Sequence, residues 1–422
     1  MCLTFYPFSV ILYPWFVLTD RKFLKEGIMS RQHIAPRRPH FHMHDVLYAL
    51  EVVGKAVVGF AKNNTVLVIA AVLAAISCII VKPDAEYLGY FDFKTLTCLF
   101  CTLAVICALK NIRFFTITAQ KIVKCAGNTK TLSLALVYIT FIGSMFLAND
   151  MALLTFLPLG YISLSATGKE KYMAPIFILQ NIAANLGGML TPFGNPQNLY
   201  IYTKFNIPTL EFMGIMALPF LLSIVMFTVC CLVFIPKESL ELTGETEVVA
   251  SKKKAVFYLV LFVFAILTVF RIVPYYICLP VTLIAILFTD IKALKKVDYP
   301  LLLTFVCFFL LSGNIARIDA VNGFFSMLLE KNTLLTAIGS CQIISNVPSA
   351  ILLSEFTENY KELLMGVNIG GVGTLISSLA SLITFREYTS HVKGKTLAYI
   401  GLFSAFNFGF LIILTLFALL LV

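Results

Sequence analysis

Charged side chains are scarce in this sequence. Asp, Glu, Lys and Arg make up 13% of its 422 residues, about half of their share in an ordinary globular chain. A chain with so little charge cannot cover its surface with polar groups, so most of that surface must face something other than water. This scarcity excludes a soluble enzyme, a nucleic-acid-binding protein and a disordered scaffold.

Apolar side chains are correspondingly abundant. Hydrophobic residue types make up 59% of the chain, and its mean hydropathy is +0.91. The sequence therefore predicts an all-α polytopic membrane protein, with the lipid bilayer as its surroundings. The net charge of +10 fits basic cytoplasmic loops, and we expect no nucleic acid partner. The 11 cysteines lie scattered in apolar segments, which is typical of helix packing rather than of a metal site.

The amino-terminal stretch differs from the rest of the chain. Lys25-Glu26-Gly27 can be encoded by a bacterial ribosome-binding sequence, and Met29 follows at a suitable distance. We therefore expect translation to start at Met29, with residues 1–28 as upstream leader sequence. The remaining predicted divisions are a basic cytoplasmic segment at 29–62, a first repeat at 63–235, a linker loop and linking helix at 236–275, and a second repeat at 276–422.

Two of the long apolar runs are interrupted at their centres by polar residues. The run 131–166 is broken at Ala148-Asn149-Asp150, and the run 333–357 is broken at Ser345-Asn346-Val347-Pro348. Each predicts a re-entrant helical hairpin whose tip stops at mid-membrane. Nine further runs are long enough to cross a bilayer, at 65–82, 93–109, 173–203, 210–235, 255–273, 276–290, 300–313, 361–384 and 396–422.

The loops between these runs obey the positive-inside rule when both broken runs are hairpins. The loops on the side of the basic amino terminus carry 17 Lys and Arg, and the opposite loops carry six. We therefore expect a multi-pass protein of the inner cell membrane, with the amino terminus in the cytoplasm and the carboxyl terminus outside.

The order of elements occurs twice along the chain. Each half reads as span, span, amphipathic connector, hairpin, interrupted span and span, and the second half begins from the opposite side. Inverted repeats with paired broken helices are typical of secondary transporters, which hold their substrate at the midplane between the breaks. The sequence thus predicts two inverted repeats with re-entrant hairpins and unwound transmembrane helices, about 11 membrane elements in all.

Two of the nine crossing runs, 173–203 and 361–384, also contain a polar or glycine-rich interruption, and these interrupted spans differ in how strongly they indicate binding. The stretch 190–198 contains two prolines and three side-chain amides, which is too polar for helix packing alone. The glycine-rich stretch 370–374 is as consistent with close helix packing as with binding.

Asp150 is the only carboxylate that we expect near the membrane centre. An ionised acid there costs at least ~2.5 kcal/mol, which makes Asp150 a candidate to bind Na⁺ or to carry a proton. The alternative is an ordinary cap for the second hairpin helix. No Lys or Arg lies at any break, so helix N-termini and bound cations would have to neutralise an anionic substrate.

At these breaks the sequence resembles the ion-transporter superfamily, in the citrate-transporter-like branch. That branch is related to arsenite permeases and to sodium/proton antiporters of the NhaD type. The matching stretches are Ala148-Asn149-Asp150 with the following MALLTFLPL, NLGGMLTPFGNPQNLYIY from Asn185, SNVPSAILL from Ser345, and GGVGTLISSLASLI from Gly370.

The resemblance also implies which residues bind. With Asp150, the implied cation ligands are Asn149, Gly194, Asn195, Asn346 and Thr374. The implied substrate contacts are Thr191, Asn198, Ser345, Asn346, Ser377 and Ser378. The sodium-dicarboxylate branch carries Ser-Asn-Thr at both tips, whereas this chain has Ala-Asn-Asp and Ser-Asn-Val. The first tip is thus more similar to the arsenite permease and antiporter branches.

These observations predict a secondary active transporter rather than an enzyme. We expect it to move a small anion of the citrate or dicarboxylate kind, coupled to Na⁺ or H⁺ and with no other cofactor. The resemblance implies an elevator-like alternating-access movement and a homodimer. The alternatives are an arsenite or antimonite efflux permease, a Na⁺/H⁺ antiporter and, less in keeping with the repeat, a channel. An intramembrane enzyme would need a base, and the only histidine beyond residue 44 is His391, expected in a loop.

Overall fold

The structure, a computed structural model, describes residues 58–61, 64–240 and 251–422. The chain divides into two units, Met1–Asn63 and Asn64–Val422, and all helices named below belong to the second unit. The expected leader 1–28 and the expected start at Met29 lie outside the described residues.

The second unit is built of helices. Its described residues contain no β-strand, and a single isolated bridge joins Asn128 to Ser239. The helices of the first half are α4 (Thr65–Ile80), α5 (Phe93–Asn111), α6 (Phe114–Val123), α7 (Thr129–Phe146), α8 (Asn149–Ala166), α9 (Met173–Gly187), α10 (Pro196–Lys204) and α11 (Thr209–Phe234). The helices that follow are α12 (Lys252–Val269), α13 (Tyr275–Thr289), α14 (Ile291–Leu294), α15 (Tyr299–Ala316), α16 (Asp319–Lys331), α17 (Thr333–Ile344), α18 (Asn346–Leu353), α19 (Tyr360–Ile369), α20 (Leu379–His391) and α21 (Thr396–Leu419).

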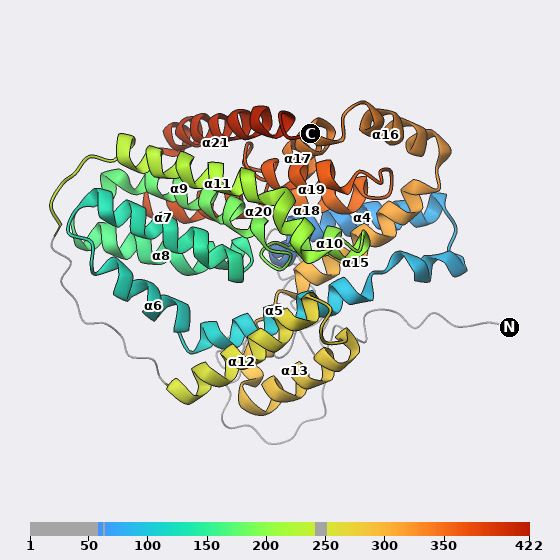
Figure 1. Ribbon diagram of the computed structural model, residues 1–422, viewed down its shortest axis with the longest axis horizontal. Coiled ribbons are helices and arrows are strands. Elements are labelled where there is room, and N and C mark those ends of the chain that lie inside the picture. Colours follow the sequence, from blue (N-terminus) through green and yellow to red (C-terminus); the bar gives the residue numbers. More distant parts are fainter. Residues whose placement is uncertain (1–57, 62–63, 241–250) are drawn as a thin grey trace, which may run out of the picture. The chain divides into compact units, whose positions relative to one another are not determined.

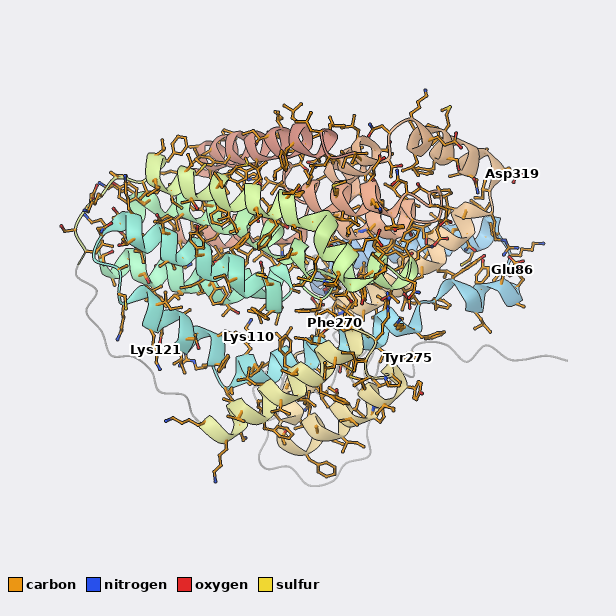
Figure 2. The ribbon with its side chains drawn as sticks, viewed as in Figure 1. Glu86, Lys110, Lys121, Phe270, Tyr275 and Asp319 are labelled. Carbon is orange, nitrogen blue, oxygen red and sulfur yellow. The ribbon has the colours of Figure 1, made fainter. Side chains whose placement is uncertain are left out.

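The length and composition of these helices confirm an all-α polytopic membrane protein. Six helical segments of the described residues are long and apolar enough to cross a membrane, at 93–111, 129–146, 170–190, 209–234, 299–316 and 396–419. The side chains that project from the long helices are mostly hydrocarbon (Figure 2), and many large apolar ones are exposed. Exposed apolar surface on this scale is stable in lipid and not in water.

The helix contacts of the two halves follow one pattern. In the first half α7 packs on α9, and in the second half α17 packs on α19. Between the halves α4 packs on α15 and α5 on α13, while α8 packs on α20 and α18 on α10. Each pair has a counterpart when the two halves are exchanged, so the repeat expected from the order of elements is also a repeat in space. Figure 1 shows α7, α9 and α11 of the first half side by side.

Each of the two runs predicted as hairpins, 131–166 and 333–357, divides into two helices that pack on each other. The residues Leu147 and Ala148 separate α7 from α8, and Ser345 alone separates α17 from α18. The run predicted at 361–384 differs from the prediction at its end, because α20 continues to His391, which was expected in a loop. The N-cap Ser378 starts this helix, and the stacking of Tyr388 on Tyr399, with ring centroids 4.2 Å apart, holds its polar last turns.

A cluster of charged groups outside the apolar spans fixes the base of the first hairpin. The carboxylate of Glu238, in the loop after α11, accepts hydrogen bonds from Lys169 Nζ at 2.6 Å, from Lys171 Nζ at 2.7 Å and from the Tyr172 hydroxyl. Lys169, then Lys171 and Tyr172, lower the pKa of Glu238 to about 2. Thr129, the first residue of α7, is bound to the same loop through its hydroxyl and the Pro236 carbonyl.

Candidate functional site

The two hairpin tips present an asparagine in the same position. Asn149 opens α8 and Asn346 opens α18, and both side chains are buried. The Oδ1 of each accepts a hydrogen bond from the next backbone N–H, at 3.0 Å from Asp150 and at 2.9 Å from Val347. This bond fixes both amides, so each tip offers a preorganised polar group.

The second tip also holds an unusual backbone conformation. Ser345 has φ 76° and ψ 159°, a region that residues other than glycine rarely adopt and that costs on the order of 1–3 kcal/mol. The Asn346 N–H donates to the Ser377 carbonyl at 3.0 Å, and the Ser377 hydroxyl donates to the Gly371 and Thr374 carbonyls. The second tip is therefore bound to the unwound stretch after α19.

In the first half the chain unwinds between α9 and α10, and Asn198 holds the loop. Its Nδ2 lies 3.0 Å from the Gly188 carbonyl, 3.4 Å from that of Met189 and 3.3 Å from that of Thr191. The Thr191 hydroxyl donates to the Met145 carbonyl of the first hairpin at 3.1 Å. These contacts satisfy the carbonyls that the broken helix leaves without partners.

In the second half the side chain of Gln342 bonds to the unwound backbone, as that of Asn198 does in the first half. Its Nε2 donates to the Gly370 carbonyl at 2.9 Å and to the Val372 carbonyl at 3.2 Å, and its Oε1 accepts from the Thr374 N–H at 2.9 Å. The Thr374 hydroxyl donates back to the Gln342 carbonyl at 3.1 Å. Gln342 lies on α17, so the hairpin itself holds the unwound stretch after α19.

Two asparagines in the last turns of α9 and α19 connect the breaks, Asn185 within the first half and Asn368 between the halves. The Asn185 Oδ1 accepts from Asn149 Nδ2 at 3.0 Å, and the Asn368 Nδ2 donates to Asn198 Oδ1 at 2.6 Å. A Cβ built on Gly371 would lie 3.1 Å from Asn346 Nδ2 and 3.7 Å from Asn185 Oδ1. The first tip, the second tip and both unwound helices thus converge on one buried cluster of amides.

Three oxygens at the breaks are buried without a hydrogen-bond partner among the described residues. They are Asp150 Oδ1, Asn195 Oδ1 and Gln197 Oε1. Asp150 does not cap α8, since the N-cap is Ala148 and no side chain caps that end. An unsatisfied buried oxygen costs roughly 1–3 kcal/mol, and an oxygen-seeking cation would relieve that cost.

The predicted site residues fall into two groups. Asn149, Asp150, Asn195, Asn346 and Ser345 lie at the tips or carry unsatisfied atoms. The remaining ones shape the breaks. Thr191 and Thr374 bond to backbone carbonyls of the hairpin helices α7 and α17, and Asn198 and Ser377 bond to unwound backbone. Ser378 caps α20 through the Ser381 N–H, and Gly194 lies so close to the Gly188 carbonyl that a Cβ would approach it to 2.3 Å.

Three residues of the cluster were missing from the sequence prediction. They are Asn185, Asn368 and Gln342. A signal for the first two exists in the sequence, because Asn185-Leu-Gly-Gly-Met-Leu-Thr191 and Asn368-Ile-Gly-Gly-Val-Gly-Thr374 share the pattern Asn-x-Gly-Gly-x-x-Thr at equivalent points of the two halves. Gln342 has no such partner pattern and is revealed by its contacts alone.

Comparison with known proteins shows relatives along most of the chain. Residues 47–360 match the family model described as citrate transporter. An uncharacterized transporter of Methanocaldococcus jannaschii is 32% identical over 323 residues, which cover 76% of this chain and 88% of that protein. The inner membrane protein YbiR of Escherichia coli is 29% identical over 282 residues, which cover 65% of this chain and 74% of that protein. The chain is a membrane transporter and belongs to the citrate transporter family.

Proposed function

We propose that this protein is a secondary active transporter that moves a small anion of the citrate or dicarboxylate kind together with Na⁺ or H⁺. The observation that carries the proposal is the convergence of both hairpin tips and both unwound helices on one amide cluster. The contacts are Asn149–Asn185, Asn198–Asn368 and the hydrogen bond from the Asn346 N–H to the Ser377 carbonyl. Paired broken helices around one point are the arrangement in which transporters hold substrate and coupling ion.

The unsatisfied oxygens at the first tip and at the break between α9 and α10 suit a cation. Asp150 supplies a carboxylate oxygen without a protein partner, and Asn195 and Gln197 supply neutral amide oxygens in the same condition. Hard cations take oxygen ligands, and a carboxylate adds the one negative charge that the site otherwise lacks. The coupling cation would therefore bind first at this tip, or a proton would bind to Asp150 itself.

The anion would be held by charge that is not on basic side chains. The stretches 147–151, 185–198, 342–349 and 368–381 contain no Lys or Arg. Positive potential comes instead from the N-termini of α8, α10 and α18, which all begin at the breaks, and from the bound cation. A substrate whose site is completed by a cation binds tightly only after that cation, which couples the two fluxes.

The fold supports alternating access. The hairpins and broken helices form one packed group, and α4, α5, α12, α13 and α15 form another. We propose that the first group moves against the second in an elevator-like manner, with the hairpins re-entrant. The name of the Escherichia coli relative and the basic loops favour the inner membrane, with the amino terminus in the cytoplasm and the carboxyl terminus outside.

A second candidate function is arsenite or antimonite efflux, or Na⁺/H⁺ antiport. Asp150 favours antiport in particular, since a carboxylate at the first tip can exchange a proton for Na⁺ without an anionic substrate. The same site would then serve cations alone.

Thermal unfolding of the purified full-length protein separates these functions. The ligands are citrate, succinate, malate, sulfate and arsenite, each with Na⁺ or with K⁺ and at two pH values. A ligand at 100 times its dissociation constant stabilises the folded state by about 2.7 kcal/mol. Stabilisation by a carboxylate that requires Na⁺ or low pH supports coupled anion transport. Stabilisation by Na⁺ with no further gain from any anion moves the function to antiport, and a protein indifferent to every combination contradicts both.

A further inference from the structure

A groove opens where α5 and α13 end and α12 begins. Its volume is about 550 Å³. Its lining includes Lys254, Lys292 and Lys296 together with the apolar Leu287 and Phe288. None of these residues belongs to the amide cluster between the hairpins.

The positive charge of the groove exceeds the negative charge. Asp290 is the one acidic residue of its lining, and it accepts a hydrogen bond from Asn111 Nδ2 at 2.8 Å. Lys296 Nζ donates to the Oδ1 of the same asparagine at 2.6 Å. The ammonium groups of Lys254 and Lys292 have no hydrogen bond or ion pair among the described residues. In the described part of the chain, two lysines of the groove are thus left to an anion.

The apolar residues of the lining indicate which kind of anion fits the groove. Phe288 is 83% exposed and Leu287 45% exposed, and both line the same groove as the lysines. A ligand that fills the groove meets hydrocarbon and ammonium groups together, which suits an amphiphile with a negatively charged head. The residues of the groove at 111–112, 254 and 291–296 lie in three loop regions that the charge pattern assigns to the cytoplasmic side, and 287–290 end the adjoining span.

We propose that this groove binds an anionic phospholipid of the inner leaflet. The lipid phosphate lies between Lys254, Lys292 and Lys296, and an acyl chain lies along Leu287 and Phe288. The groove joins α5, α12 and α13, so the bound lipid stabilises the contact of the linking helix with both halves of the chain.

The test compares lipids on the purified full-length protein in neutral detergent. Phosphatidylglycerol and phosphatidylcholine of equal chain length are added, and lipid binding is measured by native mass spectrometry together with the melting temperature. Wild-type protein is expected to bind phosphatidylglycerol preferentially and to melt at a higher temperature with it. The double variant Lys254→Gln/Lys292→Gln removes no side-chain hydrogen bond or ion pair among the residues that the structure describes, and it should weaken that binding roughly 25-fold, about 5-fold for each lysine.

The matched control removes two exposed lysines from other basic loops. Lys121, which projects from α6 (Figure 2), and Lys393 are replaced by Gln, which changes the net charge equally. This control should bind phosphatidylglycerol like wild type. Full lipid binding by the Lys254/Lys292 variant, or an equal loss in the control, overturns the proposal. So does inorganic phosphate that raises the melting temperature as much as the lipid at matched ionic strength, because the site would then take a soluble anion.

Discussion

Gly188 offers the sharpest test of the amide cluster. A Cβ at this position would lie 2.4 Å from Asn195 Oδ1 and 2.8 Å from its Nδ2, so Gly188→Ala must displace the Asn195 side chain. The backbone needs no change, because Gly188 has φ −67° and ψ −11°, which alanine adopts readily. The substitution therefore acts on Asn195 and not on the course of the chain.

The size of the effect follows from what Asn195 loses. Its Nδ2 donates to the Asn185 carbonyl at 3.3 Å and to Asn368 Oδ1 at 3.5 Å. Two hydrogen bonds of about 0.5–1.5 kcal/mol each amount to roughly 1–3 kcal/mol. Because the ligand binds only the arrangement that these bonds hold, it must restore that arrangement at this cost, and its affinity falls about 5- to 150-fold. Uptake into proteoliposomes, with the cation concentration varied, measures this affinity.

Alanine substitutions at two other glycines should affect transport less than Gly188→Ala does. Gly371→Ala should have a smaller effect, because its Cβ would lie 3.1 Å from Asn346 Nδ2 and a small shift accommodates it. Gly339→Ala, in α17, meets nothing within 4 Å and should leave transport unchanged, with helix stability raised by up to about 1 kcal/mol. If Gly188→Ala acts through Asn195, the double variant Gly188→Ala/Asn195→Ala is no worse than Asn195→Ala alone. A folded Gly188→Ala protein with wild-type cation affinity would refute the site.

Further predictions concern charge and the second tip. Asp150→Asn should abolish the Na⁺ or pH dependence of uptake and leave the protein folded, and a variant with wild-type dependence would exclude Asp150 from the cation site. Asn346→Ala should reduce uptake at least tenfold, whereas Cys98→Ala, a buried control on α5, should not; equal losses would mean that packing alone is being measured. Glu238 has a folded-state pKa of about 2, below its ordinary 4.5, so its contribution to stability is present above pH 4.5 and is lost as the pH falls toward 2. Glu238→Gln should therefore lower the melting temperature at neutral pH and flatten its fall between pH 5 and pH 2, which a pH series of melting curves checks against the wild type.

The breaks could be predicted from the sequence because each places polar residues inside an apolar run. Asn149-Asp150 and Asn195-Pro196 are conspicuous for this reason, and the structure interrupts its helices at both. The partners of the breaks could not be predicted in this way. Asn368 lies within a helix and bonds to Asn198, 170 residues away, and only the fold brings them together. The backbone of Ser345 is likewise set by its contacts, since serine has no preference for a positive φ.

The two halves share their amides but not their charge. Asn149 and Asn346 occupy equivalent positions, yet the next residue is Asp150 in the first half and Val347 in the second. The strained backbone occurs only at the second of these two tips, where Ser345 has φ 76°, whereas Ala148 at the first tip has φ −49°. A cation at the first tip would therefore be bound by charge, and one at the second tip by dipoles alone, which are weaker and depend on geometry. Under the proposed function the first site fills at the lower cation concentration, and closing the second site around substrate draws on the strain stored at Ser345.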